Sequence, residues 1–209
     1  MKNLLNTGIL LLFACTVFSQ GYEGTIEFKK IKGNKSTSYI YYIKQHLVRL
    51  EEYGAKKTIV DLAIINTKEN KVNLLSPERR TYMEVHTKPS TKDMKNTRVR
   101  MTQESRTILG KPCKKWIVEN PDYNSRVTYW VTKGDYYFFP GLLTAINRKD
   151  HHALFYQQVP DAGGYFPMVS EETTLDGQPL GRLEVTKMEK KPMNGKFFII
   201  PETYSKLEN

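Results

Sequence analysis

The sequence predicts a mainly β protein with one large antiparallel sheet, crossed by one or two short helices. Three observations lead to this fold class. After residue 20, apolar and polar residues alternate with a period of two, and the alternating segments are rich in aromatic and β-branched residues. Polar turns separate these segments at intervals of roughly 8–15 residues, which is typical of an antiparallel meander.

The first half of the chain is predicted to contain strands only. Tyr22, Gly24, Ile26 and Phe28 alternate with polar residues and form the first strand, which ends before a turn at Gly33-Asn34. The tyrosines and isoleucines of residues 38–45 indicate a second strand, and residues 46–53 are expected to continue it. Further strands are expected over residues 57–65, 71–75 and 80–85.

The second half combines strands with a helical segment. A polar loop over residues 86–96 precedes strands predicted over residues 98–108, 113–119 and 126–132. Between residues 134 and 167 the apolar residues have helical spacing, interrupted at residues 147–150, so one or two short helices are expected to lie against the sheet. Strands resume over residues 167–175 and 180–190, and the apolar segment 197–201 closes the chain.

The N-terminus has the organisation of a cleaved signal peptide. Lys2 supplies a positive charge, an apolar run follows, and Val17 and Ser19 are small enough for a cleavage site before Gln20. The run is shorter than the about 20 apolar residues of a membrane span. Residues 1–19 are therefore predicted to be removed on export, and residues 20–209 to form one domain of a periplasmic or secreted protein.

The two cysteines leave a question open. Residues 12–15 approximate a bacterial lipobox, and in this alternative the protein is a lipoprotein anchored through Cys15. If Cys15 is removed with the signal peptide, Cys113 is the only cysteine and no intramolecular disulfide forms. Cys113 has no His or Asp beside it to activate the thiol, so it is expected to be buried as a small apolar residue.

The chain is basic, with 32 Lys and Arg residues against 22 Asp and Glu residues and a net charge of +10. Export excludes nucleic acid as the partner of this charge. Anionic lipid head groups, lipopolysaccharide or an acidic protein are what a basic exported surface meets. The basic residues are scattered over most segments, which indicates a generally solvated positive surface.

The order of several short motifs is similar to that of a known family. The motifs include Thr25-Ile26-Glu27, the turn Gly110-Lys111-Pro112 and the strand Tyr129-Trp130-Val131, and in full they cover residues 22–28, 49–51, 59–62, 75–82, 107–114, 127–132 and 198–204. In this order they resemble the DUF4412 family of exported bacterial proteins, which is related to the LolA/LolB-like lipoprotein-carrier superfamily. The resemblance covers nearly all of the mature chain.

The resemblance implies a curved antiparallel sheet, a LolA-like half-barrel, whose concave side is covered by short helices. In the carrier proteins this concave side holds acyl chains, and a ligand and helices cover apolar surface that is unstable in water. The resemblance supplies no catalytic motif, and a fold alone does not establish a function.

The candidate ligand-binding residues are aromatic and aliphatic side chains in and beside the predicted helical segment. Ordinary core packing is the alternative role for the same residues. They are Trp116, Trp130, Tyr137, Phe139, Leu142, Leu143, Ile146 and Leu154.

No metal, cofactor or catalytic site is predicted. Asp150-His151-His152 is the one local cluster that suggests a metal ligand, but adjacent histidines diverge on a helix and lie on opposite faces of a strand. A solvated surface is the expected place for them. The sequence contains no nucleophile elbow, phosphate-binding loop or metalloprotease motif.

Three hypotheses of function follow. One of them, an unrecognised hydrolase, needs a polar cleft with convergent ionisable groups, which the sequence does not predict, so an enzyme is not expected. The first is an exported binding protein that holds a lipid, a lipoprotein acyl chain or another hydrophobic ligand in a half-barrel cavity. The alternative is an envelope protein-interaction domain without a small-molecule ligand. A sizeable apolar cavity favours the first, whereas a packed interior with an exposed contact surface favours the second.

Overall fold

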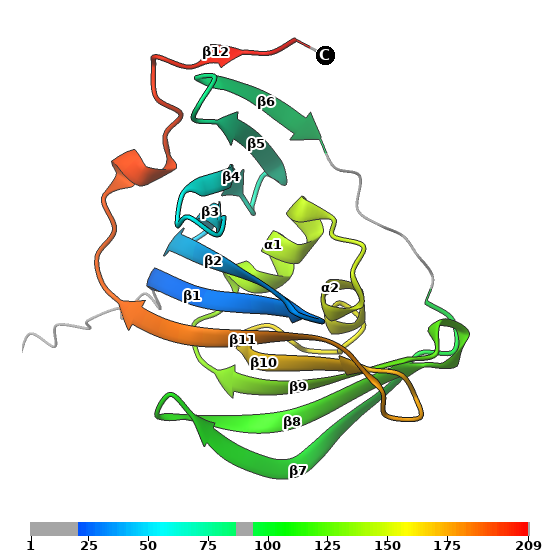
Figure 1. The fold of residues 1–209 in the computed structure, drawn as a ribbon. Helices are drawn as coiled ribbons and strands as arrows, with labels where there is room; N and C mark the ends of the chain where they lie inside the picture. The colour runs from blue at the N-terminus through cyan, green and yellow to red at the C-terminus, as the bar shows by residue number, and fades with distance from the viewer. Residues whose placement is uncertain (1–20, 87–93, 209) are drawn as a thin grey trace, which may run out of the picture.

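The computed structural model describes residues 21–86 and 94–208, and the signal-peptide and lipobox predictions therefore lie outside the described residues. Within these ranges, 12 strands form one open sheet in the order β12-β6-β5-β4-β3-β2-β1-β11-β10-β9-β8-β7 (Figure 1). The predicted fold class, one large curved antiparallel sheet with two short covering helices, is confirmed.

Eleven of the 12 strands form two meanders that are each continuous in sequence, and the short β12 (Ser205–Lys206) lies at the edge beside β6. The first meander contains β1 (Glu23–Lys32), β2 (Lys35–Lys44), β3 (Leu47–Tyr53), β4 (Ile59–Asn66), β5 (Lys71–Ser76) and β6 (Thr81–His86). The second contains β7 (Arg98–Ile108), β8 (Lys111–Asn120), β9 (Ser125–Lys133), β10 (Tyr165–Thr173) and β11 (Pro179–Lys190). The chain passes from one edge of the sheet to the other between β6 and β7, so the two meanders meet where β1 pairs with β11.

The prediction that residues 46–53 continue the second strand is wrong. The chain turns at Gln45-His46, and β3 folds back antiparallel on β2 with Lys44 opposite Leu47. Gln45 makes this reversal with a φ of 57°, in the left-handed region. Such a φ is uncommon for a residue other than glycine, so the local sequence carries no turn signal at this point.

The seam between β1 and β11 requires a glycine. Gly24 has a φ of 145°, and a Cβ atom at this position would lie 2.0 Å from the backbone oxygen of Glu189 on β11. Only a residue without a side chain allows the two strands to approach this closely. The β1–β11 pairing therefore depends on this position.

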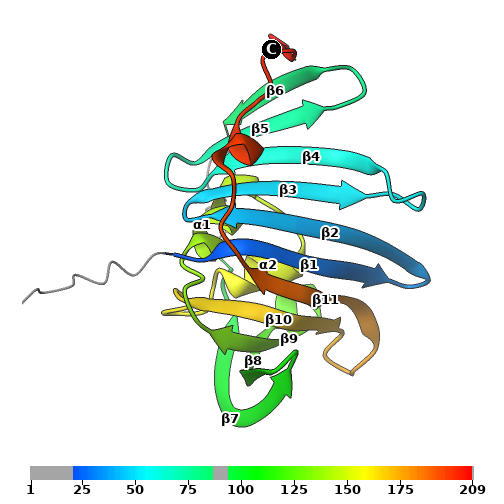
Figure 2. The same ribbon diagram turned by 90° about the vertical axis from the view of Figure 1, so that its left-hand side faces the viewer.

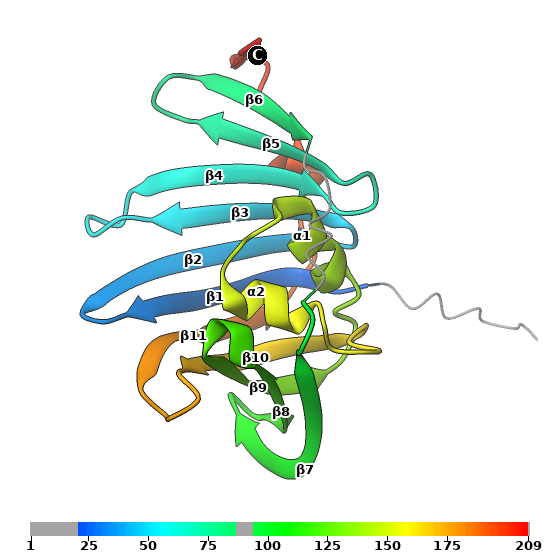
Figure 3. The ribbon, with the colours of Figure 1, turned by 90° about the vertical axis from the view of Figure 1, so that its right-hand side faces the viewer.

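Two helices lie inside the curve of the sheet, α1 (Phe138–Ile146) and α2 (His151–Tyr156) (Figure 3). The prediction of two short helices interrupted at residues 147–150 is confirmed. α1 ends where Asn147 adopts a left-handed φ of 43°, and α2 begins where the carboxylate of Asp150 accepts a hydrogen bond from the backbone N–H of Ala153.

The main core fills the space between the helices and the sheet. Its aromatic rings make edge and stacked contacts across the two layers, with Phe139 of α1 4.7 Å from Phe166 of β10 and 5.0 Å from Tyr156 of α2, centroid to centroid. Such ring pairs contribute about 0.5–1.5 kcal/mol each beyond the area they bury. Cys113 is fully buried, as predicted from the sequence.

The chain ends in a strap over the outer face of the sheet, here called the C-terminal strap (residues 191–208) (Figure 2). The apolar segment 197–201 does not form a strand of the main sheet: it contains the end of a short 3₁₀ helix, η2 (Gly195–Phe198), and Phe197 stacks on Tyr42. Ile200 and Tyr204 pack on a small outer cluster with Leu62 at its centre. The strap ends in β12 (Ser205–Lys206), which pairs in parallel with β6.

None of the helices in the described ranges has the length and apolar character needed to cross a membrane.

Candidate binding site

A small cavity lies where α1 and α2 meet the concave face of the sheet, here called the helix-covered pocket. It has about 60 Å³ of free space, which corresponds to about four to six water molecules at 10–15 Å³ each. The wall is mainly aromatic and aliphatic, with Arg148, Asp150, His152, Ser170 and Glu184 as its polar members. The apolar members include Phe28, Tyr41, Phe139, Leu143, Ile146, Phe166, Leu183 and Val185.

A larger depression lies beside it, over the concave face of β3 to β6, here called the open groove. It has a volume of about 330 Å³, and its floor is apolar, with Leu50, Ala63, Val72 and Val85. Glu52 and Asp61 lie opposite each other on β3 and β4 and supply acidic side chains. Ile146 and Arg148 line both spaces, so the helix-covered pocket and the open groove adjoin at the end of α1.

Arg148 is the cation at this junction. Its guanidinium lies 5.6 Å from the centre of the Tyr39 ring, a cation–π distance. Asp150, the nearest carboxylate in sequence, pairs instead with Lys30 at 3.5 Å. Burial opposes the charge of Arg148, but the attraction of Tyr41, Asp150, Tyr39 and Glu52 together outweighs it and raises the pKa of the guanidinium. Burial also raises the pKa of the Tyr41 hydroxyl to about 12. Arg148 therefore stays charged under all ordinary conditions.

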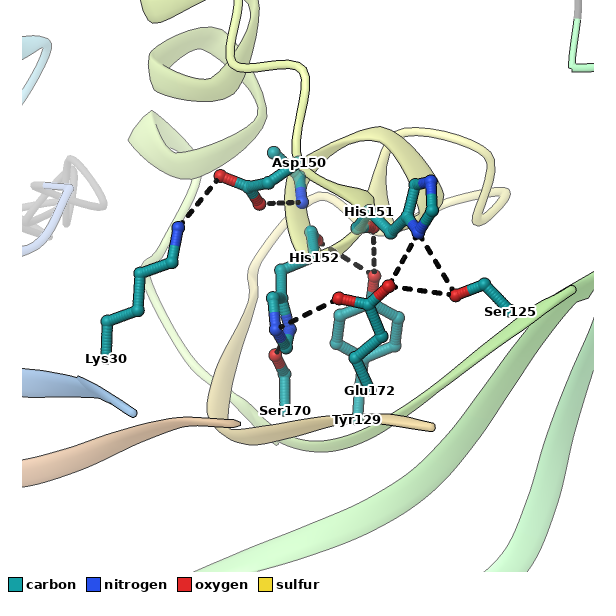
Figure 4. A network of polar contacts seen from close by, with 9 residues as sticks. Lys30, Ser125, Tyr129, Asp150, His151, His152, Ser170 and Glu172 are labelled. Atoms are coloured by element: carbon teal, nitrogen blue, oxygen red, sulfur yellow. Dashed lines mark hydrogen bonds and ion pairs between the residues drawn. The ribbon is translucent and has the colours of Figure 1, made fainter. Parts of the chain in front are cut away.

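A cluster of polar side chains fixes α2 to the sheet, here called the histidine cluster (Ser125, His151, His152, Ser170 and Glu172) (Figure 4). The Nδ1 atom of His151 lies 2.6 Å from Oε1 of Glu172 and 3.1 Å from the hydroxyl of Ser125. Nδ1 of His152 is hydrogen-bonded to Ser170, and its Nε2 lies 3.8 Å from the second oxygen of Glu172. Glu172 thus lies between the two histidines.

Within this cluster, His152 favours its neutral form, whereas Glu172 favours its charged form. Burial lowers the pKa of His152 below its ordinary value of 6.5, against the attraction of Asp150 and Glu172. Burial is the largest single influence on Glu172 and opposes its charge, but the hydrogen bonds from His151 and Ser125 and the attraction of the two histidines together outweigh it and lower the pKa of the carboxyl group. At neutral pH the cluster therefore contains a neutral His152 and an ionised Glu172.

The histidine cluster does not have the geometry of a catalytic triad. A triad needs the carboxylate on one ring nitrogen of the histidine and the serine on the other, so that the ring can take the serine proton. Here both Ser125 and Glu172 lie against Nδ1 of His151, and Ser125 donates directly to Glu172 at 3.0 Å. At His152, Ser170 lies on Nδ1 and Glu172 on the side of Nε2, but the 3.8 Å to Glu172 is too long for a hydrogen bond. Ser125 and Ser170 are both buried. The contacts hold α2 in place and do not form a nucleophile.

The predicted ligand-binding residues are divided among several places. Phe139, Leu143 and Ile146 line the helix-covered pocket. Leu142 and Leu154 are buried in the core. Trp116 is also buried, 6.3 Å from Tyr156 of α2 and 4.8 Å from Tyr165.

The other two predicted residues point elsewhere. Tyr137 is 66% exposed. Trp130 follows Tyr129, which contacts α2, so the alternation along β9 directs Trp130 to the outer face. There the guanidinium of Arg106 lies 4.0 Å from its ring centre.

Sequence reasoning missed the histidine cluster. The expectation of a solvated surface is wrong for His152, which is 6% exposed, and His151 is partly covered by Phe155 and Tyr123. Ser170 and Glu172 are two residues apart on β10 and share its concave face, which is a signal of polar residues pointing inward. The contact with residues about 20 positions earlier in the chain has no local signal.

No group of three or more His, Cys, Asp and Glu side chains suited to a metal ion occurs among residues 21–86 and 94–208.

The comparisons with known proteins concern the family and the fold. The model of a domain of unknown function, DUF4412, matches residues 22–204. No curated protein matches the chain. An uncharacterized conserved protein from Thermus thermophilus has a similar structure, with a TM-score of 0.53 and 10% identity over 91% of each chain. This similarity shows a shared fold.

Two further solved structures overlap less well. MucB in complex with MucA(peri) has a TM-score of 0.47 and 10% identity, over 91% of this chain and 57% of that chain. PNGF-II has a TM-score of 0.46 and 15% identity, over 90% of this chain and 31% of that chain. The chain thus spans 57% of the MucB structure and about a third of the PNGF-II structure. Similarities of this extent do not indicate its role.

Proposed function

Because this chain belongs to the DUF4412 family, whose domain has no assigned function, its role has to be argued from its own site, and we propose that it is a non-catalytic binding protein. In this proposal it is exported through residues 1–19 and holds a lipid, a lipoprotein acyl chain or another hydrophobic molecule between its helices and its sheet. Whether the mature protein is free or anchored through Cys15 does not change the site.

The observation that carries the proposal is the junction of the two spaces at Ile146 and Arg148. The helix-covered pocket alone is too small for an acyl chain, because ligand sites usually enclose about 300–1,000 Å³. The open groove, at about 330 Å³, lies in that range. An apolar chain lying in the groove could place its end in the pocket and cover surface that otherwise faces water.

The first experiment is native mass spectrometry of the mature protein, purified from a bacterial envelope without detergent. A reproducible additional mass that organic extraction identifies as lipid supports the proposal. A mass of the protein alone, unchanged after incubation with envelope lipids, contradicts it.

A second experiment locates the ligand with the fluorescent apolar probe N-phenyl-1-naphthylamine at pH 7.5. Ile146→Asp places a charge at the junction of pocket and groove, and we expect at least tenfold weaker binding, equivalent to about 1.4 kcal/mol. Tyr137→Asp introduces the same charged residue at an exposed position outside both spaces, and it should leave the affinity for the probe unchanged. Equal affinities of the two variants would place the probe elsewhere.

The alternative role is an envelope protein-interaction domain, and the free edge of β7 favours it. β7 is 11 residues long and, within residues 21–86 and 94–208, pairs only with β8. The strand has three arginines, Arg98, Arg100 and Arg106, and one acid, Glu104, which pairs with Lys115. A basic open edge fits an extended acidic segment of a partner, although charged side chains also protect edges from pairing. A mass of the protein alone in the first experiment would direct attention to this edge.

A further inference from the structure

α2 forms part of the cover of the helix-covered pocket, and it is fixed to the sheet by buried apolar side chains, Leu154, Phe155 and Tyr156, together with polar contacts. His152 and Ala153 of α2 line the pocket. The Tyr129 hydroxyl on β9 donates to the backbone oxygen of His152 at 2.8 Å, and His152 itself is bonded to Ser170 on β10. With only six residues, α2 has little intrinsic stability. Its position therefore depends on these contacts.

The groups around His152 come from four strands and from α2 itself. On α2, His151 lies on the far side of Glu172, and Asp150 at the helix start is paired with Lys30 of β1. β10 supplies Glu172 and Ser170, and β9 supplies the neutral Tyr129. Gly181 of β11 lies beside the His152 ring, since a Cβ atom at this glycine would be 3.5 Å from Nε2 of His152. Arg148 and Glu184 complete the charged groups of the same pocket wall.

The surroundings of His152 would stabilise a positive charge on its ring only weakly. Glu172 is the one carboxylate within ion-pair distance of His152 in the described structure, and it already accepts hydrogen bonds from His151 and Ser125. Asp150 already forms an ion pair with Lys30. A protonated His152 would be a buried charge with a shared, distant counter-ion, which is costly in an apolar pocket.

We propose that the histidine cluster is a pH-sensitive switch that holds α2 on the sheet at neutral pH and releases it in mildly acidic surroundings, opening the helix-covered pocket. This inference rests on the proposed function, because it concerns access to the same pocket. An exported protein meets changes of external pH that the cytoplasm does not.

The sign of the effect follows from the protons bound in each state. With α2 docked, the pKa of His152 is lowered from 6.5, so the docked state binds fewer protons than the released state. Its stabilisation is therefore complete above about pH 6.5 and is lost as the pH falls below that value. The lowered pKa of Glu172 acts in the same direction at still lower pH. For one proton, the docking equilibrium shifts by up to about tenfold per pH unit.

The test uses ligand-free protein and a reporter that the chain already contains. The sequence has two tryptophans, and Trp130→Phe leaves Trp116, whose ring lies 6.3 Å from Tyr156 on α2. We expect the fluorescence of Trp116 to change in a transition below pH 6.5, while far-ultraviolet circular dichroism shows that the sheet persists. Hydrogen exchange should increase in α2 over the same pH range, after correction for intrinsic exchange.

Variants then assign the transition. His152→Gln keeps a hydrogen-bonding group but cannot be protonated, and it should abolish the change between pH 6.5 and 5. Ser170→Ala leaves His152 titratable but weakens docking, and it should move the midpoint to higher pH. His86→Gln removes an exposed histidine outside the cluster and should leave the profile unchanged.

An unchanged transition in both His152→Gln and Ser170→Ala would overturn the inference, as would a Trp116 signal that is constant from pH 7.5 to 5. Because the reporter is read without ligand, this failure is separate from failure of the proposed function. That function is tested by probe binding at pH 7.5, where the switch is closed.

Discussion

At the scale of single residues, the outer face of the sheet contains a buried charge with a structural role. Glu51 on β3 is 3% exposed. It accepts hydrogen bonds from Arg49, whose Nη2 lies at 2.6 Å, and from the hydroxyl of Tyr53. A buried carboxylate of this kind is stable only while its partners remain, because an uncompensated charge in the interior is strongly destabilising.

Glu51→Gln is therefore expected to lower the free energy of unfolding by about 2 kcal/mol, below the 3–5 kcal/mol of fully buried pairs because Arg49 keeps some contact with water. Urea unfolding at pH 7 measures the difference. Glu171→Gln removes the partner of Arg182 in a more exposed pair, and it should cost less than about 1 kcal/mol. A loss at Glu51 no larger than at Glu171 would contradict this interpretation.

Residue roles were only partly predictable from the sequence. An apolar stripe on a short helix predicts that Phe139, Leu143 and Ile146 face the sheet, and they line the helix-covered pocket, while their role in binding a ligand stays a prediction. The histidine cluster was not predicted, since His152 and Ser170 come together only when α2 docks on β10. Local patterns report which face a residue occupies, but they do not report which distant residue it meets.

At the scale of elements, the seam between β1 and β11 is a sensitive position. Gly24→Ala places a methyl group against the backbone of Glu189, in a conformation that other residues rarely adopt. We expect the free energy of unfolding to fall by about 1–3 kcal/mol or more, and Tm to fall by roughly 2–4 °C for each kcal/mol lost. Thermal unfolding followed by circular dichroism measures it.

Gly195 provides a control for this substitution. It has an ordinary φ, and no heavy atom lies within 4 Å of the place that an added methyl group would take, so Gly195→Ala should leave Tm nearly unchanged. If both variants melted at the temperature of the natural protein, β1 would not be held against β11 as closely as the structure indicates.

The same contrast between local and distant signals explains which elements the sequence revealed. Strands with regular alternation, such as β9, and the helix interruption at residues 147–150 were predicted correctly, because their signals are local. The β2–β3 reversal was missed, since Gln45 and His46 are not residues that turns prefer. Tertiary pairing of the two strands, and not turn chemistry, determines the reversal.

At the scale of the whole molecule, the C-terminal strap follows β11 and crosses the outer face of the first meander. The backbone N–H of Met193 donates to Glu23 of β1 at 2.6 Å, and β12 pairs with β6 at the edge. Ile200 and Tyr204 cover Leu62 and its neighbours. The strap thus protects both apolar surface and a strand edge.

Deletion of the C-terminal strap after Lys190 is expected to lower the free energy of unfolding by roughly 3–6 kcal/mol, from partial exposure of several apolar side chains at about 1.5–3 kcal/mol each. Calorimetry measures the shift in Tm. Ile199→Ser, at a side chain that is 64% exposed, should change the free energy by less than about 0.5 kcal/mol. A deletion as mild as Ile199→Ser would mean that the strap covers little of the outer face.

The order of the strands was beyond sequence reasoning. The motifs that resemble a known family implied a curved open sheet, and the structure has one. The pairing of the first strand of one meander with the last strand of the other joins residues more than 150 positions apart, and periodicity within a strand carries no information about such partners.

This strand order has a practical consequence. Cutting the chain in the connection between β6 and β7 would yield two polypeptides, each an unbroken meander, that share only the β1–β11 seam and the contacts of the helices and strap. Phe28 and Tyr41 of the helix-covered pocket would belong to one fragment, and both helices to the other. A molecule in the pocket would bridge the fragments and favour their association by mass action. Association of the two fragments would then serve as a sensor, because formation of the complete sheet would indicate that the ligand is present.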